Sequence, residues 1–223
     1  DRRDLKDYFS NLNDSYFNKN LSNSLKWQSE LIIMNRDKNF VVGCKNRFEN
    51  LIEIFIKVDN SEGLFYKLTK TLEYSGLDII DANIFTSIDN IFAANTFITK
   101  FSHHDRKFSK SDLKELSKRI EKNFIHFDQI SSKPKKVKIK NNFEKRINIS
   151  ESINKNRGRN LITIETSDNL GLLANIAKVF FENKISIFSA RINTLGERVE
   201  DTFEIENSDK TLVSESKIKK IIS

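Results

Sequence analysis

Cysteine, proline and glycine are scarce in this sequence of 223 residues, and each scarcity excludes a class of protein. Cys44 is the only cysteine, which excludes an intramolecular disulfide and a zinc site built from several cysteines. A single cysteine also fits a reducing compartment. One proline and six glycines favour well-formed helices and strands joined by compact turns over a long flexible segment.

A long hydrophobic run and a leader pattern are missing as well. No stretch reaches the roughly 20 apolar residues of a membrane-spanning helix, and no signal-peptide pattern opens the chain. We therefore expect a cytoplasmic protein with no membrane partner. The first residue is Asp1 rather than Met, and we expect the sequence to be part of a longer protein.

Much of the formal net charge of +7 lies in one basic run, residues 133–140. Lysines at this density can contact nucleic acid or an acidic partner. However, no aromatic residue interleaves with them, and no helix-turn-helix pattern is evident. A solvated linker that leads into a strand, with Val137 and Ile139 inward, is therefore favoured over a nucleic-acid interface.

Patterns that carry catalysis are missing too. His103, His104 and Asp105 are reminiscent of a metal-dependent phosphohydrolase, but such a site needs an earlier histidine and His103 is the first. Nucleotidyl transfer needs a Gly-Ser turn followed by closely spaced carboxylates, and no Gly-Ser pair occurs. Cys44 stands alone, and no serine has a nucleophile-elbow setting. We therefore predict no catalytic residue, no metal site and no cofactor in this chain.

An internal repeat is the most informative feature that is present. Its first copy has an alternating strand at 51–58, a polar turn at 59–63 and then an amphipathic helix. Its second copy has a strand at 161–166, a turn at 167–171 and a similar helix, and this alignment makes the first turn one residue longer. The matched residues are Asp59/Asp168, Asn60/Asn169, Gly63/Gly171, Leu64/Leu172, Ile79/Ile187, Ala82/Ala190, Ile84/Ile192 and Thr86/Thr194.

The rest of each copy predicts two more strands and a second helix. These elements are expected at 77–86, 91–101 and 110–127 in the first copy, and at 185–194, 198–206 and from Ser214 in the second. Each copy thus has the order βαββα of the ferredoxin-like arrangement, with a final strand expected in the first copy. A unit of about 70 residues buries only a marginal core alone. We therefore expect the two units to pair and to form a groove that suits a ligand.

The two turns, Asp-Asn-x-x-Gly-Leu at 59–64 and Asp-Asn-x-Gly-Leu at 168–172, resemble the signature turn of ACT domains. These are small-molecule sensing modules that are commonly appended to metabolic enzymes. Segments 77–86 and 187–203 are similar to the tandem ACT region that ends the bifunctional PII uridylyltransferase/uridylyl-removing enzymes, and Leu195-Gly-Glu-Arg-Val-Glu-Asp201 is the most specific part. In that family Pro usually precedes the turn glycine, whereas Glu62 and Leu170 stand there in this chain.

The resemblance implies an α+β fold of two ferredoxin-like βαββα(β) ACT units with antiparallel sheets, preceded by a helical connector. We expect the connector at 1–49, the first ACT domain at 50–145, a linker or strand at 146–159 and the second ACT domain at 160–223. The second unit has no obvious last strand, and we expect 146–153 to fill that edge of its sheet. We also predict that Trp27 anchors a connector helix by core packing.

The two turns are the candidate ligand sites. A glycine-containing turn before a helix presents backbone N–H groups to a carboxylate, and Asp or Asn can bind an ammonium or amide group. The alternative is that these residues only cap the helix or turn the chain, but two copies in one context and the resemblance favour binding. The candidate ligand-binding residues are Asp59, Asn60, Gly63, Leu64, Asp168, Asn169, Gly171 and Leu172.

The resemblance implies a regulatory, glutamine-sensing part of an enzyme that adds uridylyl groups to PII signal proteins and removes them. The implied partners are glutamine or another amino acid, and PII through the parent enzyme, while Mg²⁺ is implied for the absent catalytic domains. Two alternatives remain. One is a stand-alone ACT-repeat regulator of another enzyme, and the other is a basic nucleic-acid-binding module that uses residues 133–140.

Overall fold

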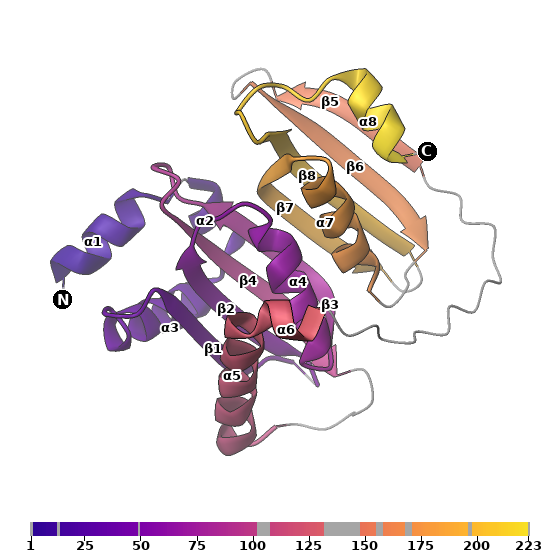
Figure 1. The fold of residues 1–223 in the computed structure, drawn as a ribbon. Helices are drawn as coiled ribbons and strands as arrows, with labels where there is room; N and C mark the ends of the chain where they lie inside the picture. Colours follow the sequence, from indigo (N-terminus) through magenta and orange to yellow (C-terminus); the bar gives the residue numbers. More distant parts are fainter. Residues whose placement is uncertain are drawn as a thin grey trace.

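The computed structural model describes residues 2–12, 14–48, 50–101, 108–131, 148–154, 158–167, 171–195 and 198–222. Within this part of the chain, the strands form one 8-stranded sheet in the order β1-β2-β4-β3-β7-β8-β6-β5 (Figure 1). The strands are β1 (Phe40–Asn46), β2 (Ile52–Asp59), β3 (Leu77–Thr86), β4 (Phe92–Phe101), β5 (Asn148–Asn154), β6 (Arg159–Ser167), β7 (Ile185–Leu195) and β8 (Arg198–Asn207). The helices are α1 (Arg2–Ser10), α2 (Asp14–Lys19), α3 (Ser22–Met34), α4 (Leu64–Tyr74), α5 (Lys110–Ile125), α6 (Phe127–Ser131), α7 (Leu172–Glu182) and α8 (Glu215–Ile222).

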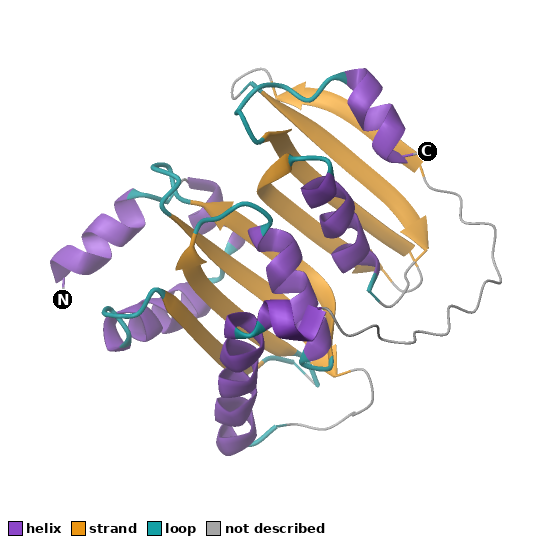
Figure 2. Ribbon diagram, viewed as in Figure 1, coloured by secondary structure: helices purple, strands orange, loops and turns teal. Residues whose placement is uncertain are grey.

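The sheet consists of two half-sheets with the same order of elements (Figure 2). Each half has two strands, a helix, two further strands and a helix, and all neighbouring strands are antiparallel. The halves join where β3 pairs with β7, with Ile84 opposite Ala190. On one face of the sheet at this junction, α4 packs against α7, and the ring centroids of Phe65 and Phe203 are 6.3 Å apart. The predicted α+β fold of two ferredoxin-like units is therefore confirmed.

The outer edges of the sheet are filled by the strands that precede each repeat. As expected for 146–153, β5 pairs with β6, with Ser152 opposite Leu161. In the first half, β1 takes the equivalent place beside β2, with Lys45 opposite Glu53. The prediction of a helical connector at 1–49 is therefore wrong for residues 40–46, which form a strand. The final strand that was expected after the first unit would fall mainly in 132–147, outside the described residues.

Strand register also corrects the alignment of the two turns. Ile54 pairs with Phe97, and in the second unit Ile162 pairs with Phe203. Since β2 ends at Asp59 before Gly63, and β6 ends at Ser167 before Gly171, the two turns have the same length. Asp59 is thus equivalent to Ser167. The sequence alignment that matched Asp59 with Asp168 was therefore shifted by one residue. A shift of one residue would turn the buried face of the strand outward, so the strand determines the register.

Two hydrophobic cores lie on opposite faces of the sheet. The larger one spans both units beneath α4, α5, α7 and α8. The smaller one packs α1, α2 and α3 against the first half-sheet and includes Tyr16, Phe55 and Phe85. Trp27 of α3 lies edge-on to Phe55 at 6.5 Å between ring centroids, and Lys45 Nζ lies 4.4 Å from the Trp27 ring. The predicted anchoring role of Trp27 is confirmed.

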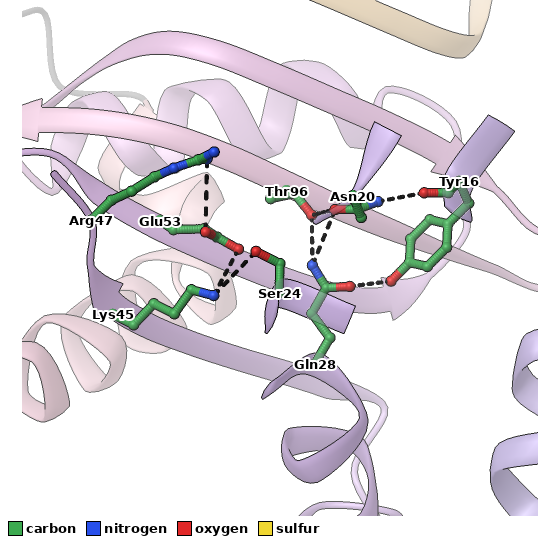
Figure 3. Close-up of polar contacts among 8 residues, drawn as sticks. All are labelled: Tyr16, Asn20, Ser24, Gln28, Lys45, Arg47, Glu53 and Thr96. Atoms are coloured by element: carbon green, nitrogen blue, oxygen red, sulfur yellow. Dashed lines mark hydrogen bonds and ion pairs between the residues drawn. The ribbon is translucent and has the colours of Figure 1, made fainter. Parts of the chain in front are cut away.

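A buried polar network holds the same helices to the sheet (Figure 3). Gln28 of α3 is fully buried, and its side-chain oxygen accepts a hydrogen bond from the Tyr16 hydroxyl. Its amide nitrogen donates to Thr96 Oγ1 at 3.1 Å and to Asn20 Oδ1 at 3.3 Å. Since Thr96 belongs to β4, the network links α2 and α3 to an inner strand of the first unit.

Next to it lies an ion-pair cluster around Glu53, whose side chain is buried on β2. Lys45 Nζ lies 3.2 Å from Glu53 Oε1 and donates to Ser24 Oγ at 3.2 Å (Figure 3). Arg47 adds a longer contact to the other carboxylate oxygen at 3.7 Å. The cluster therefore ties α3, β1 and β2 together by charge as well as by apolar packing.

Cys44 of β1 should react slowly in the folded protein. Burial raises the pKa of its thiol to about 12, although contact with Ser117 acts in the opposite direction. Because the thiolate is the nucleophile, we expect a disulfide reagent at pH 8 to react about 100-fold more slowly with the folded chain than with free cysteine. The folded state also keeps a proton that the unfolded state loses, so the free energy of unfolding should fall as pH rises above about 9. Rapid thiol reaction without urea at pH 8 would contradict this prediction.

Candidate functional site

Two cavities lie along the boundary between the units, and each is built from both of them. The first, about 260 Å³, is lined by residues 60–66 of the first unit and by Ile185–Phe188 at the start of β7. The second, about 150 Å³, is lined by residues 171–174 of the second unit and by residues 77–80 at the start of β3. Each cavity thus combines the turn of one unit with a strand of the other.

The backbone of each turn requires glycine where the helix begins. Gly63 precedes α4 with φ 70°, and Gly171 precedes α7 with φ 76°, so both are left-handed. A side chain with Cβ disfavours this conformation. At Gly63 a Cβ would also stand 2.6 Å from the ring of Phe181, which belongs to α7 of the other unit. The ring of Phe181, from the second unit, therefore packs directly against the first turn.

Asn60 connects the first turn to the hairpin between β3 and β4. Its backbone N–H donates to the Ile91 carbonyl at 2.8 Å, and its side-chain amide donates to the Asn90 carbonyl at 3.2 Å. No side chain caps the start of α4. The Leu64 N–H donates to the Ser61 carbonyl at 3.2 Å, and Phe65 and Tyr66 of the first turn of the helix line the cavity.

The structure brings together five of the eight predicted residues at the cavities. Asn60, Gly63 and Leu64 line the first, and Gly171 and Leu172 line the second. Asp59 is the exposed last residue of β2 and is absent from both linings as described. Asp168 and Asn169 lie outside the described residues, as do 103–105 and 133–140.

Sequence reasoning missed the wall that the opposite unit supplies. In the first cavity this wall includes Ser186 and Glu206. Arg159 Nε lies 2.6 Å from Glu206 Oε2, and the Arg159 guanidinium lies 3.7 Å from the centroid of the Phe188 ring. The repeat alone could not reveal these residues, because it does not show that β3 pairs with β7.

The second cavity is the more acidic of the two. Glu73, Asp78 and Asp201 line it, together with Lys100. The Glu73 carboxylate is paired with Lys70 at 2.7 Å. A Cβ placed on Gly171 would lie 3.5 Å from Glu73 Oε2, which is an ordinary contact. Position 73 of α4 is equivalent to position 181 of α7, so a carboxylate faces one turn and a phenyl ring faces the other.

Among the described residues, no group of three or more His, Cys, Asp or Glu side chains could hold a metal ion. The helices within the described ranges include none that is long and apolar enough to cross a membrane. The described residues form two cavities along the boundary between the paired units.

Paired ferredoxin-like units that share one sheet, with a glycine turn of each unit facing the other, have the architecture of tandem ACT domains. The chain is 25% identical to the bifunctional uridylyltransferase/uridylyl-removing enzyme of Psychrobacter arcticus, with 98% of this chain and 25% of that enzyme aligned. It is 27% identical to the enzyme of the same name from Pasteurella multocida, with 96% and 24% aligned. The resemblance inferred from the motifs is thus confirmed over nearly the whole chain.

The chain spans about a quarter of the length of these relatives, with 25% and 24% of them aligned. No family model matches it. Among solved structures, aspartate kinase from Synechocystis is similar with a TM-score of 0.40 and 15% identity, covering 77% of this chain and 25% of that one.

Proposed function

We propose that this chain is the regulatory, ligand-sensing part of a bifunctional uridylyltransferase/uridylyl-removing enzyme, and that its ligand is glutamine bound beside Gly63. The similarity to 25% of such an enzyme, over 98% of this chain, supports a part of that enzyme rather than the whole. Uridylyl transfer to and from PII, with the Mg²⁺ that it needs, would then belong to the rest of the protein.

The observation that carries the proposal is the composition of the first cavity. On one side is the start of α4, which no side chain caps and where the helix dipole favours a carboxylate. On the other side is the Glu206 carboxylate, whose Oε2 is paired with Arg159 at 2.6 Å and which an ammonium group would share with that guanidinium. Asn60, Asn90 and Asn95 can pair with a side-chain amide. A volume of about 260 Å³ is below the roughly 300–1,000 Å³ of pockets for drug-sized ligands, and suits an amino acid.

Such a ligand would contact both units at once. It would therefore favour the arrangement in which the Gly63 turn and the start of β7 stand at their present separation. A differential affinity of 1–3 kcal/mol between two arrangements is ordinary for allosteric coupling. Binding in the millimolar range needs only about 4 kcal/mol, which a few charge-assisted hydrogen bonds can supply.

Calorimetric titration tests this proposal. We expect saturable heat with L-glutamine, and weaker or no heat with L-glutamate. Glu206→Gln should weaken glutamine binding at least about tenfold, because it removes the charged acceptor of the ammonium group and leaves the positive charge of Arg159 without its carboxylate partner. The control Asp59→Asn changes an exposed carboxylate that is not part of either described lining, and should alter affinity less than about twofold. No heat at about 20 mM glutamine, a very weak affinity, would contradict the assignment of the ligand.

The second cavity supports a different candidate, an ACT-repeat regulator that binds a basic amino acid. Three carboxylates and one lysine line that cavity, namely Glu73, Asp78, Asp201 and Lys100. If this candidate is correct, L-lysine or L-arginine should give saturable heat that Asp201→Asn weakens, whereas glutamine should give none.

A further inference from the structure

The outer edge of β1 is a second feature that the ligand-sensing proposal does not use. Within the described residues, β1 is an edge strand of the sheet and pairs only with β2. Its other edge therefore presents backbone N–H and C=O groups that are available for a further strand.

A groove of about 480 Å³ runs along this edge between α3 and α5. Trp27 and Leu31 line it from α3, and Lys110, Leu113 and Lys114 line it from α5. In Figure 1, β1 lies at the end of the first half-sheet with both helices beside it. The groove thus has two helical walls and a strand edge as its floor.

The two walls differ in chemistry. Gly43 faces α3, since a Cβ there would lie 3.0 Å from Trp27 Cζ2, whereas Phe40 stacks on Phe124 of α5 at 4.5 Å. Successive residues of an added strand would likewise face α3 and α5 in turn. The α3 wall offers Trp27 and Leu31, with Lys45 Nζ 4.4 Å from the centroid of the Trp27 ring. The α5 wall offers Leu113 together with the exposed Lys110 and Lys114. No Asp or Glu occurs among the described residues that line the groove.

We propose that this edge binds an extended segment of a partner protein in which apolar residues alternate with Asp or Glu. The segment adds a ninth strand to the sheet, with its apolar side chains on Trp27 and Leu31 and its carboxylates beside Lys110 and Lys114. Charge argues against a second copy of this chain as the occupant, because two such edges would bring their lysines together.

The test uses the whole chain and a fluorescein-labelled peptide of three Val-Glu repeats, followed by fluorescence anisotropy. We expect saturable binding with a dissociation constant below about 1 mM, and no binding of a peptide of three Val-Lys repeats. The variant Lys110→Glu/Lys114→Glu should weaken binding at least about tenfold. Both changes lie in the first turns of α5, where acidic residues suit the helix dipole, so the helix should remain folded.

The matched control is Lys118→Glu/Lys122→Glu, which makes the same charge change on the same helix outside the groove lining. It should change affinity less than about twofold. A third peptide, with alternate backbone nitrogens methylated, should not bind if the contact is strand addition. The proposal is overturned by equal loss in both double variants, by full binding of the methylated peptide, or by no binding at about 1 mM. It is also overturned if the chain sediments as a dimer that Lys110→Glu/Lys114→Glu separates, since the groove would then hold a second copy.

Discussion

Gly63→Ala is expected to lower the free energy of unfolding by about 2–4 kcal/mol and to abolish ligand binding in the first cavity. Two costs add. The left-handed φ of 70° costs an alanine about 1–2 kcal/mol, and the new Cβ would lie 2.6 Å from the Phe181 ring. That ring is stacked on Tyr66 at 6.0 Å, so moving it breaks a second contact at the cavity wall. Urea unfolding measures the first effect, and calorimetry measures the second.

Other glycines with the same backbone separate these costs. Gly158 has φ 63° and no atom within 4 Å of its Cβ position, so Gly158→Ala should show the backbone cost alone. Gly171→Ala should behave similarly, because its nearest neighbour is Glu73 at an ordinary 3.5 Å. The double variant Gly63→Ala/Phe181→Ala should lose less stability than the sum of the two single variants, and a double-mutant cycle measures this difference. If Gly63→Ala costs no more than Gly158→Ala, the ring does not restrain the turn.

Gln28→Leu is expected to destabilise the helical layer by about 2–4 kcal/mol, although leucine fills a similar volume. The substitution leaves the buried Tyr16 hydroxyl without its acceptor, and removes the donor to Thr96 and Asn20. Burial raises the pKa of Tyr16 far above its ordinary value, so the group remains a neutral donor that needs an acceptor. The fluorescence of Trp27, the single tryptophan, reports unfolding of this layer directly.

Removing both partners should cost less than the sum of removing each one separately. In Tyr16→Phe/Gln28→Leu the hydroxyl that loses Gln28 as its acceptor is itself removed, and we expect recovery of about 1–2 kcal/mol relative to the sum of the two single variants. Strict additivity would show that the hydrogen bond between Tyr16 and Gln28 contributes nothing to stability. A shift of the Trp27 transition without a shift of the β-sheet signal in circular dichroism would show that the layer unfolds by itself.

The repeat predicted the two units because the period of two in the strands and the helical period between them recur in the same order. The edge strand β5 was predicted because the second unit had no obvious last strand, whereas β1 was missed because residues 40–46 include Gly43 and follow a helix. The pairing of β3 with β7 could not be predicted, because no local pattern specifies which strands meet between two domains.

For the first cavity, the sequence predicted the turn that forms one wall but not the residues of the second unit that form the other. The turn glycines were identified because a left-handed residue before a helix has few alternatives to glycine. Asp59 was included because both turns contain an Asp-Asn pair, and the two pairs were aligned with each other. The registers of β2 and β6 show that the second pair lies one residue later relative to its strand than the first. Glu206 and Ser186 were missed because they reach the first cavity from the other unit, which is a tertiary relation.

Equivalent positions 73 and 181 face the turns of opposite units, and they hold Glu73 and Phe181. In a symmetric homodimer of single units one codon would specify both positions, and every substitution would change two sites together. A chain that carries both copies removes this constraint, because each site can change without its counterpart. Duplication within one gene therefore allows one site to become selective while the other keeps only a structural contact or acquires a ligand of its own.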